Sequence, residues 1–279
     1  MNPKIQGLIF DEDKQQFKIR ELEVSITSKC HLQCNNCGFC IPSQPSPSLS
    51  GNVIEELSAS LSHLKRLNIN IGSLGLLGGE PSFNKSNLEL ALKAFSKFDN
   101  INRIEIVSHG LTPQNITKES LKLIDKISLS IYFDNKKLIT LWEEYLLKFA
   151  SHIELSLRIE KVWDRWFGEE VVDDEKAQEL FDSCWYRKHC VTLERQRIFM
   201  CSRIPKLSQD KEGLILDSTT SFDDILNYLN KTEFTNSCKS CIPMMGLSTV
   251  KAGVQPDNRI HKMIPKAIQF LTSELNEKS

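Results

Sequence analysis

The sequence has no long hydrophobic run and no excess of charge of either sign. None of its apolar stretches approaches the roughly 20 residues that a membrane-spanning helix needs. The first residues, MNPKIQGLIFDEDKQQ, lack the basic region followed by an apolar core that marks a secretory signal. A formal net charge of −1 gives no electrostatic basis for binding nucleic acid or an anionic membrane. We therefore expect a soluble, cytoplasmic protein with neither kind of partner.

Cysteine is absent from the whole middle of the chain. Random core cysteines would be scattered, whereas the nine present here fall into two groups. A reducing cytosol disfavours structural disulfides, so this distribution points to metal binding or catalysis. The first group is Cys30, Cys34, Cys37 and Cys40, and the second is Cys184, Cys190, Cys201, Cys238 and Cys241.

Hydrophobic periodicity predicts strands that alternate with helices over the first part of the chain. This alternation is typical of βαβ units and a parallel sheet. Five strands are expected before residue 160 and a sixth around 160–167, too few for a closed eight-stranded barrel. The fold class is therefore α/β, a partial (β/α)6 barrel of parallel strands. The expected strands are 21–27, 73–79, 103–108, 127–132 and 153–159, and the expected helices are 52–67, 85–97, 115–126 and 137–149.

The regular alternation ends near residue 170, and the chain shows no internal repeat. We expect the partial barrel to span 1–170, a small cysteine-rich domain to span 171–260 and a C-terminal helix to span 261–279. The sequence VTLERQRIFMC at 191–201 reads as a hairpin within the second segment. A Pro/Ser-rich stretch at 41–52 is incompatible with regular structure.

Cys30, Cys34 and Cys37 form a C-x3-C-x2-C motif directly after the expected strand 21–27. Three thiolates on a tight loop can hold three irons of a 4Fe–4S cluster and leave the fourth iron open to a cofactor or substrate. Structural zinc, which takes four ligands, is the alternative, because Cys40 could supply the fourth thiolate.

Two further motifs follow expected strands, at the edge of the sheet where reactive groups of parallel sheets lie. Gly78, Gly79, Glu80 and Pro81 follow the second strand, and Ser108-His109-Gly110 follows the third. Taken alone, GGEP is more often a turn, and a loop histidine beside glycine is usually solvated.

The C-x3-C-x2-C motif after one strand, with GGEP after the next, resembles the signature of radical S-adenosylmethionine (SAM) enzymes over about residues 20–165. The resemblance implies a cluster on Cys30, Cys34 and Cys37 whose open iron binds SAM. It also implies an electron donor such as flavodoxin or ferredoxin, and a 5′-deoxyadenosyl radical that removes a hydrogen atom from the substrate. Asn36 departs from the family, which has an aromatic residue before the third cysteine. The residues implied to contact SAM are Gly78, Gly79, Glu80, Ser108, Ser130 and Arg158.

The C-terminal cysteines resemble the auxiliary-cluster segment of the SPASM/twitch radical SAM subgroup, in its single-cluster twitch form. Cys184 and Cys201, with sixteen residues between them, fit the spacing of the hairpin cysteines in that subgroup, whereas Cys190 is too close to Cys201. Gln196 stands where the subgroup has glycine. Four-cysteine zinc is the alternative to a second 4Fe–4S cluster. The ligands implied for the second cluster are Cys184, Cys201, Cys238 and Cys241.

Two enzymatic functions and one non-enzymatic function remain open. The first is dehydrogenation or epimerisation of a secondary alcohol carbon in a carbohydrate-like small molecule, with Cys190 as the thiol that would return a hydrogen atom in the epimerase. The second is modification of a ribosomally made peptide, by epimerisation or a crosslink. Peptide-modifying relatives often carry an added leader-binding domain, and the short tail before residue 21 favours the small substrate. The third is a zinc or redox scaffold. Cys40 and Cys190 are each otherwise expected to be small buried hydrophobes.

Overall fold

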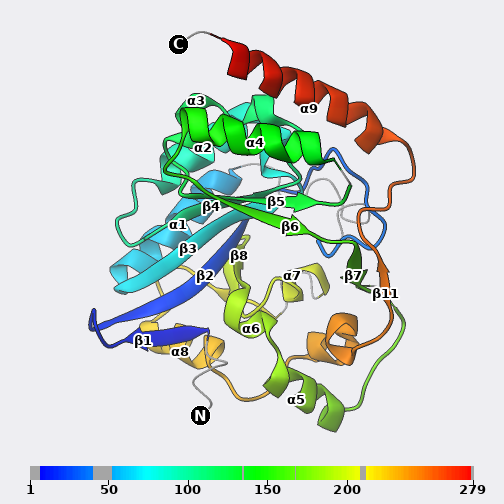
Figure 1. Cartoon of the computed structure of the whole chain (residues 1–279). Helices are drawn as coiled ribbons and strands as arrows, with labels where there is room; N and C mark the ends of the chain where they lie inside the picture. Colours follow the sequence, from blue (N-terminus) through cyan, green and yellow to red (C-terminus); the bar gives the residue numbers. More distant parts are fainter. Residues whose placement is uncertain (1–6, 40–51, 134, 167, 208–211, 278–279) are drawn as a thin grey trace.

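One large mixed sheet forms the centre of the molecule (Figure 1). The structure, a computed structural model, describes residues 7–39, 52–133, 135–166, 168–207 and 212–277. Cys40 and most of the Pro/Ser-rich stretch lie outside these residues. The strands of the sheet are β1 (Leu8–Asp11), β2 (Gln16–Thr27), β3 (Ile69–Gly78), β4 (Ile104–Ser108), β5 (Lys126–Ile131), β6 (Glu154–Ile159), β8 (Val191–Glu194), β9 (Arg197–Phe199) and β10 (Leu214–Ile215). They follow the order β10-β9-β8-β2-β3-β4-β5-β6, with β1 antiparallel to β2.

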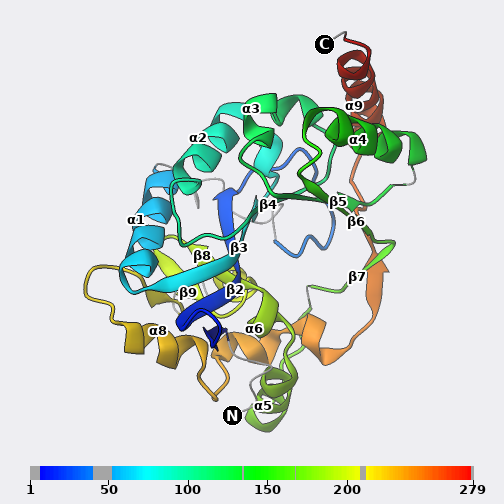
Figure 2. The same ribbon diagram turned by 60° about the vertical axis from the view of Figure 1, so that its left-hand side comes forward.

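Strands β2 to β6 are neighbours in chain order, and every adjacent pair among them is parallel. Helices connect them and lie along the outer face of the sheet (Figure 2). The expected α/β fold with parallel strands is therefore confirmed. The connecting helices are α1 (Val53–Arg66), α2 (Lys85–Phe95), α3 (Lys118–Leu121) and α4 (Lys136–Phe149).

Several details differ from the sequence expectation, and β2 and β3 begin earlier than the expected strands, at Gln16 and Ile69. The segment 160–167 contains a strand, β7 (Val162–Asp164), but β7 pairs antiparallel with β11 (Thr249–Lys251) in a separate two-stranded sheet. The sixth parallel strand is instead β8, which lies beside β2. Helix α3 is much shorter than the expected helix at 115–126, because Asp125 already bonds the β4 backbone, its carboxylate accepting from Ile104 N at 2.7 Å.

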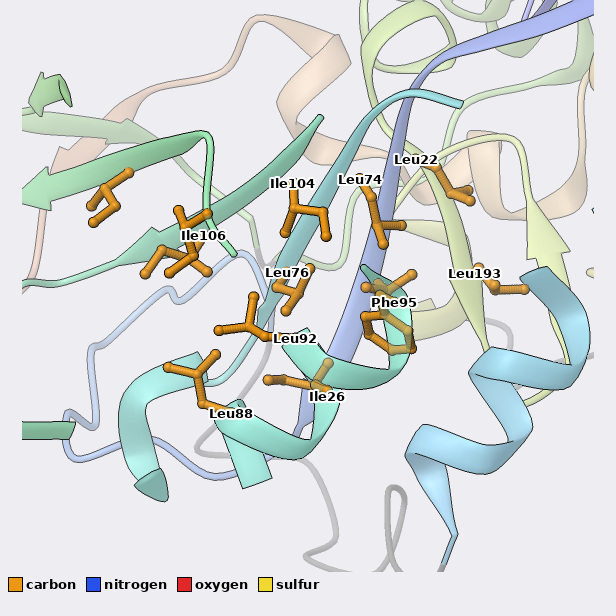
Figure 3. Packing of buried hydrophobic residues seen from close by; sticks show 14 of the residues in the cluster. Leu22, Ile26, Leu74, Leu76, Leu88, Leu92, Phe95, Ile104, Ile106 and Leu193 are labelled. Carbon is orange, nitrogen blue, oxygen red and sulfur yellow. The ribbon is translucent and has the colours of Figure 1, made fainter. Parts of the chain in front are cut away.

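Alternation along the parallel strands separates a core face from an inner face. Leu74, Leu76 and Ile106 are buried on the face of the sheet that α2 covers, where Leu92 and Phe95 lie (Figure 3). Because successive side chains of a strand point to opposite faces, the residues between them point to the inner face, away from the helices. The inner face therefore carries polar strand residues such as Glu105, Ser128 and Ser130.

The C-terminal part of the chain adds the β8–β9 hairpin to the same sheet. Its two-residue turn has positive φ at both Arg195 (53°) and Gln196 (54°), which is the type I′ geometry that favours glycine or asparagine. Gln196 therefore occupies a left-handed position for which glycine would be better suited. The remaining helices are α5 (Asp174–Ser183), α6 (Tyr186–His189), α7 (Ile204–Leu207), α8 (Phe222–Leu229) and α9 (Arg259–Asn276).

The boundary expected at residue 170 falls between β7 and α5. Two strand pairs link the segments before and after this boundary, because β8 pairs with β2 and β11 pairs with β7. Helix α9 lies beside α4 (Figure 1), and Lys148 of α4 donates to the carbonyl oxygens of Leu275 and Glu277 at 2.9 Å each. No helix in the described ranges has the length and apolar character of a membrane span.

Candidate functional site

The N-terminal cysteine loop, residues 30–37, begins just beyond the end of β2. Cys34 is buried, and Cys30 and Cys37 are half-buried. Burial raises the pKa of the Cys34 thiol to about 11, with the nearby Cys37 contributing. Burial also raises the pKa of Cys30, which feels Glu80, Cys34 and Cys37. The three cysteines of the motif are therefore neighbours in space. Asn36 has a φ of 57°, a left-handed conformation that asparagine tolerates better than an aromatic residue.

The GGEP segment is tied to the chain that leads into Cys30. Gly79 N donates to Thr27 O at 2.8 Å, and Glu80 N donates to Lys29 O at 2.9 Å. A Cβ added at Gly78, whose φ is +127°, would lie 2.1 Å from Thr27 O, and one at Gly79 would lie 2.1 Å from Lys29 O. Paired glycines are thus required for this close backbone approach. The approach is made to the cysteine loop itself.

Glu80 points inward and holds the ends of two strands together. Its carboxylate accepts from Ser82 Oγ at 2.6 Å, Ser82 N at 3.0 Å and His109 N at 2.9 Å. His109 is only 4% exposed, so the expectation of a solvated side chain is wrong. Its Nδ1 accepts from Leu111 N at 3.0 Å, which leaves the ring proton on Nε2, 3.3 Å from Glu80 Oε2. Burial lowers the pKa of His109, and Glu80 opposes that shift.

Ser108 and Ser130 lie at the ends of neighbouring strands but face opposite sides. Ser108 lies on the same face of β4 as Ile106, and its Oγ accepts from Gly110 N at 3.0 Å. Ser130 lies on the inner face of β5, directly opposite Arg158 of β6 in the strand register. The structure therefore brings Ser130 and Arg158 together and places Ser108 at the end of β4 on the opposite face.

The inner face also carries Glu105, which sequence reasoning missed. Its carboxylate accepts from Ser128 Oγ at 2.5 Å and lies 3.5 Å from Lys126 Nζ and 3.7 Å from an Arg158 nitrogen. The alternation in RIEIVS (103–108) shows only that Glu105 faces away from the core. Which partners it meets depends on the neighbouring strands. Together with Ser130, these residues make the inner face polar.

Four of the C-terminal cysteines line one cavity. Apolar side chains, among them Trp166, Phe181, Met200 and Ile204, share its wall with two arginines, Arg187 and Arg203. Burial raises the pKa of Cys241 to about 11, and the nearby Cys184 and Cys238 act in the same direction. Burial also raises the pKa of Cys201, with Cys184 and Cys241 contributing. The cysteines that line this cavity are Cys184, Cys201, Cys238 and Cys241, and Cys190 is not among its lining residues.

Cys190 lies instead at the junction of β2 and β8. Its thiol and the Ser202 hydroxyl are hydrogen-bonded to Glu23, an inner-face residue of β2. Thr192 Oγ1 lies 3.4 Å from Glu23 Oε2. Burial raises the pKa of Glu23 to about 7, a shift opposed by these two hydrogen bonds and by Arg158. Burial raises the pKa of Cys190, and the nearby Glu23 and Cys201 act in the same direction.

Comparisons with known proteins add a remote likeness in fold. No protein-family model and no curated protein matches the chain. The solved structures that it resembles include BtrN in complex with AdoMet and 2-DOIA, at 14% identity and a TM-score of 0.46, with 76% of this chain and 83% of that chain covered. A selenomethionine BtrN in an open conformation gives 15% identity and a TM-score of 0.44, covering 80% of this chain and 91% of that one. A histidine-tagged anSMEcpe with bound AdoMet gives 13% identity and a TM-score of 0.45, covering 93% of this chain and 96% of that one. At these values the likeness carries no argument about activity.

Proposed function

We propose that the chain is a radical SAM enzyme that holds a 4Fe–4S cluster on Cys30, Cys34 and Cys37. The observation that carries the proposal is the backbone contact between GGEP and the end of β2, which holds two separate motifs around one loop. When bound, the cluster and SAM supply a 5′-deoxyadenosyl radical that removes a hydrogen atom from a substrate C–H bond. The chain must position SAM and the substrate and keep water from the radical.

For the N-terminal cysteines we propose a cluster rather than zinc, because three thiolates on one short loop can hold three irons and leave the fourth open, whereas structural zinc takes four ligands. The four C-terminal thiolates would also suit tetrahedral zinc. There we propose a cluster because these cysteines accompany the N-terminal motif.

For SAM we propose contacts from both strand ends and inner-face side chains. Gly78, Gly79 and Glu80 lie where β3 ends, and Ser108 is the last residue of β4. Ser130 and Arg158 face the inner side together. The Arg158 side chain is 47% exposed and its nearest carboxylate, Glu105, is 3.7 Å away, so its guanidinium can also reach an anionic group of a ligand.

We propose a twitch-like auxiliary cluster on Cys184, Cys201, Cys238 and Cys241. A cluster with four thiolate ligands is negatively charged and has no open iron for substrate, so electron exchange is its natural role. Arg187 and Arg203 line the same cavity, and their positive charges would offset part of that charge.

The polar inner face supports a carbohydrate-like small molecule as substrate. Glu23, Glu105, Ser128 and Arg158 offer donors and acceptors suited to hydroxyl groups. Two outcomes follow for a radical at a secondary alcohol carbon. Either the radical would lose an electron to a cluster held by Cys184, Cys201, Cys238 and Cys241 and a proton to a base, giving a ketone, or Cys190 would return a hydrogen atom and invert the stereocentre. In the second case the Cys190 thiyl radical would regain its electron from the external electron donor and its proton from solvent. Peptide modification is the alternative substrate class.

The central proposal is tested by SAM cleavage. Anaerobically reconstituted protein with a strong reductant should form 5′-deoxyadenosine, measured by liquid chromatography and mass spectrometry. Replacement of Cys30, Cys34 and Cys37 by alanine should abolish the product while iron remains at the auxiliary site. A Cys190→Ala variant is the matched control, since it removes a thiol outside both ligand sets and should still cleave SAM. A wild-type protein that binds iron but never forms 5′-deoxyadenosine refutes the proposal.

The reaction outcome is tested in heavy water with the candidate substrate. Epimerisation through the exchangeable Cys190 thiol should place one deuterium on the substrate carbon, and Cys190→Ala should abolish it. Dehydrogenation should give a ketone without deuterium, and Cys190→Ala should leave it unchanged. A crosslinked peptide as the product would refute both outcomes.

A further inference from the structure

The segment that follows β11 is bonded to the N-terminal cysteine loop at several points. We name residues 252–259 the clamp segment. Asn35 N donates to Val254 O at 2.8 Å, and Gln33 N donates to Gln255 Oε1 at 2.7 Å. Arg259, at the start of α9, donates to His31 O at 2.8 Å and approaches Gln33 Oε1 at 3.2 Å. The clamp segment therefore fixes the backbone of the loop between Cys30 and Cys37.

Glycine allows the clamp segment to reach the loop. Gly253 has a φ of +65°, and a Cβ there would lie 2.3 Å from Tyr132 Cβ. Tyr132 in turn packs edge-on against Trp163 of β7, which pairs with β11. The chain thus passes from β11 over the end of β5 to the cysteine loop, as the orange segment between β11 and α9 shows in Figure 1.

One contact of the clamp segment reaches a candidate ligand atom directly. Gln255 Nε2 donates to Cys34 Sγ at 2.7 Å, and its second hydrogen faces Gly253 O at 3.1 Å. Its Oε1 accepts from Gln33 N, so hydrogen bonds hold both the oxygen and the nitrogen of the side-chain amide. The donor to the sulfur is therefore held in place by two other bonds.

We propose that Gln255 is a positioning residue that raises the reduction potential of the cluster on Cys30, Cys34 and Cys37 through its hydrogen bond to Cys34. The inference rests on the proposed function. Reduction adds one electron from the donor and increases the negative charge on the cluster and its thiolates. An N–H donor stabilises the more negative form, and hydrogen bonds to cluster sulfurs are one of the means by which proteins set cluster potentials. Gln255 thereby links the C-terminal segment to the electron uptake that SAM cleavage requires.

The test is a redox titration of anaerobically reconstituted full-length protein, followed by electron paramagnetic resonance. The signal that changes when SAM is added identifies the cluster with the open iron. Gln255→Met removes the donor at similar length, and Gln255→Glu keeps an acceptor for Gln33 N but replaces the donor by a carboxylate. At the wild-type midpoint, the ratio of reduced to oxidised cluster should fall by up to about tenfold in Gln255→Met. The shift equals the difference in strength of this hydrogen bond between the two oxidation states, and one hydrogen bond to a charged group sets its upper limit. It should fall further in Gln255→Glu.

Arg259→Lys is the matched control, because it keeps the positive charge but loses the guanidinium group that donates to His31 O and Gln33 Oε1. Its midpoint should stay at the wild-type value. The signal that does not respond to SAM should keep its midpoint in every variant. Unchanged midpoints in both Gln255 variants at full iron content overturn the inference and leave the proposed function intact. An equal shift in Arg259→Lys also overturns it, because a loosened loop would then be the cause. Absence of any SAM-responsive signal in the wild type refutes the proposed function, and the inference falls with it.

Discussion

Replacing Gly79 by alanine should disturb the N-terminal cysteine loop without removing any group that could bind a metal. The added Cβ would lie 2.1 Å from Lys29 O, whereas real Cβ atoms essentially never approach another atom within 3.0 Å. The Lys29 carbonyl would have to move by almost 1 Å. This carbonyl is backbone and accepts from Glu80 N at 2.9 Å, so it cannot yield as a flexible side chain would. The displacement falls one residue before Cys30.

The expected cost follows from two terms. Overpacking a tight site costs about 1–3 kcal/mol. Weakening the Glu80 N–H to Lys29 O bond adds about 1 kcal/mol. We therefore expect Gly79→Ala to lower the free energy of unfolding by about 2–4 kcal/mol. We also expect it to reduce the iron bound by the N-terminal cysteines after anaerobic reconstitution.

Gly75→Ala is the matched control on the same strand. An added Cβ at Gly75 would meet only Leu22 O, at 4.0 Å, an ordinary contact distance. Alanine at a strand position is neutral or stabilises by up to about 1 kcal/mol relative to glycine. Urea unfolding and iron analysis of both variants give the comparison. If Gly79→Ala is as stable as Gly75→Ala and binds as much iron, the close approach of GGEP to the cysteine loop is wrong.

Three further predictions concern the cavity lined by four cysteines, the Glu23 side chain and the hydrophobic core. Cys201→Ala should lower bound iron by about half from roughly eight per chain, whereas Cys190→Ala should not; equal iron in both refutes the assignment. Because burial raises the pKa of Glu23 from 4.5 to about 7, the wild type should lose up to about 3 kcal/mol of stability relative to Glu23→Gln as pH rises from about 4.5 to about 7. Parallel pH-dependent unfolding curves would contradict this. Leu76→Ala should lower the free energy of unfolding by about 2–5 kcal/mol, because Leu76 is fully buried. Leu90 is 60% exposed, so Leu90→Ala should lower it by less than about 0.5 kcal/mol; chemical denaturation of both variants measures the difference.

The parallel strands were predictable because their side chains alternate over several residues. In β4, Ile104 and Ile106 enter the core while Glu105 does not, and the same period of two recurs in β2 and β5. The helices that cover them repeat their buried residues at helical spacing, as Leu88, Leu92 and Phe95 do. These signals are local to each segment. They predict an element and the face that it buries.

The pairing of β8 with β2 could not be read in the same way. It consists of three residue pairs, beginning with Leu22 opposite Val191, and joins segments far apart in the sequence. A strand of four residues is too short for its alternation of side chains to show which other strand it will pair with. The expected strand at 160–167 illustrates this, because β7 exists but pairs with β11. Long-range packing decided both cases.

In the candidate site, the sequence identified residues of a distinctive type and spacing. It did not identify residues whose role depends on what the fold places beside them. Cysteines could be identified because three or four thiols at short spacing are rare outside metal sites. Glu105 and Gln255 carry no such signal, since a single glutamate in a strand and a single glutamine in a loop are common surface residues. His109 was expected to be solvated, and only the fold reveals that Glu80 holds it inside.

The β2–β8 pairing has a consequence for the proposed chemistry. Strand β2 leads directly into the N-terminal cysteine loop, and β8 leads through its hairpin to Cys201. The register that joins them therefore fixes the distance between the two groups of cysteines, and Cys190 immediately precedes β8 at this junction. A thiol that exchanges a hydrogen atom with a substrate radical must face the substrate and still exchange an electron with the auxiliary cluster. We propose Cys190 for this role because it interacts with Glu23 on the inner face and with Cys201. The same pair of strands would thus place the two redox groups and the thiol between them.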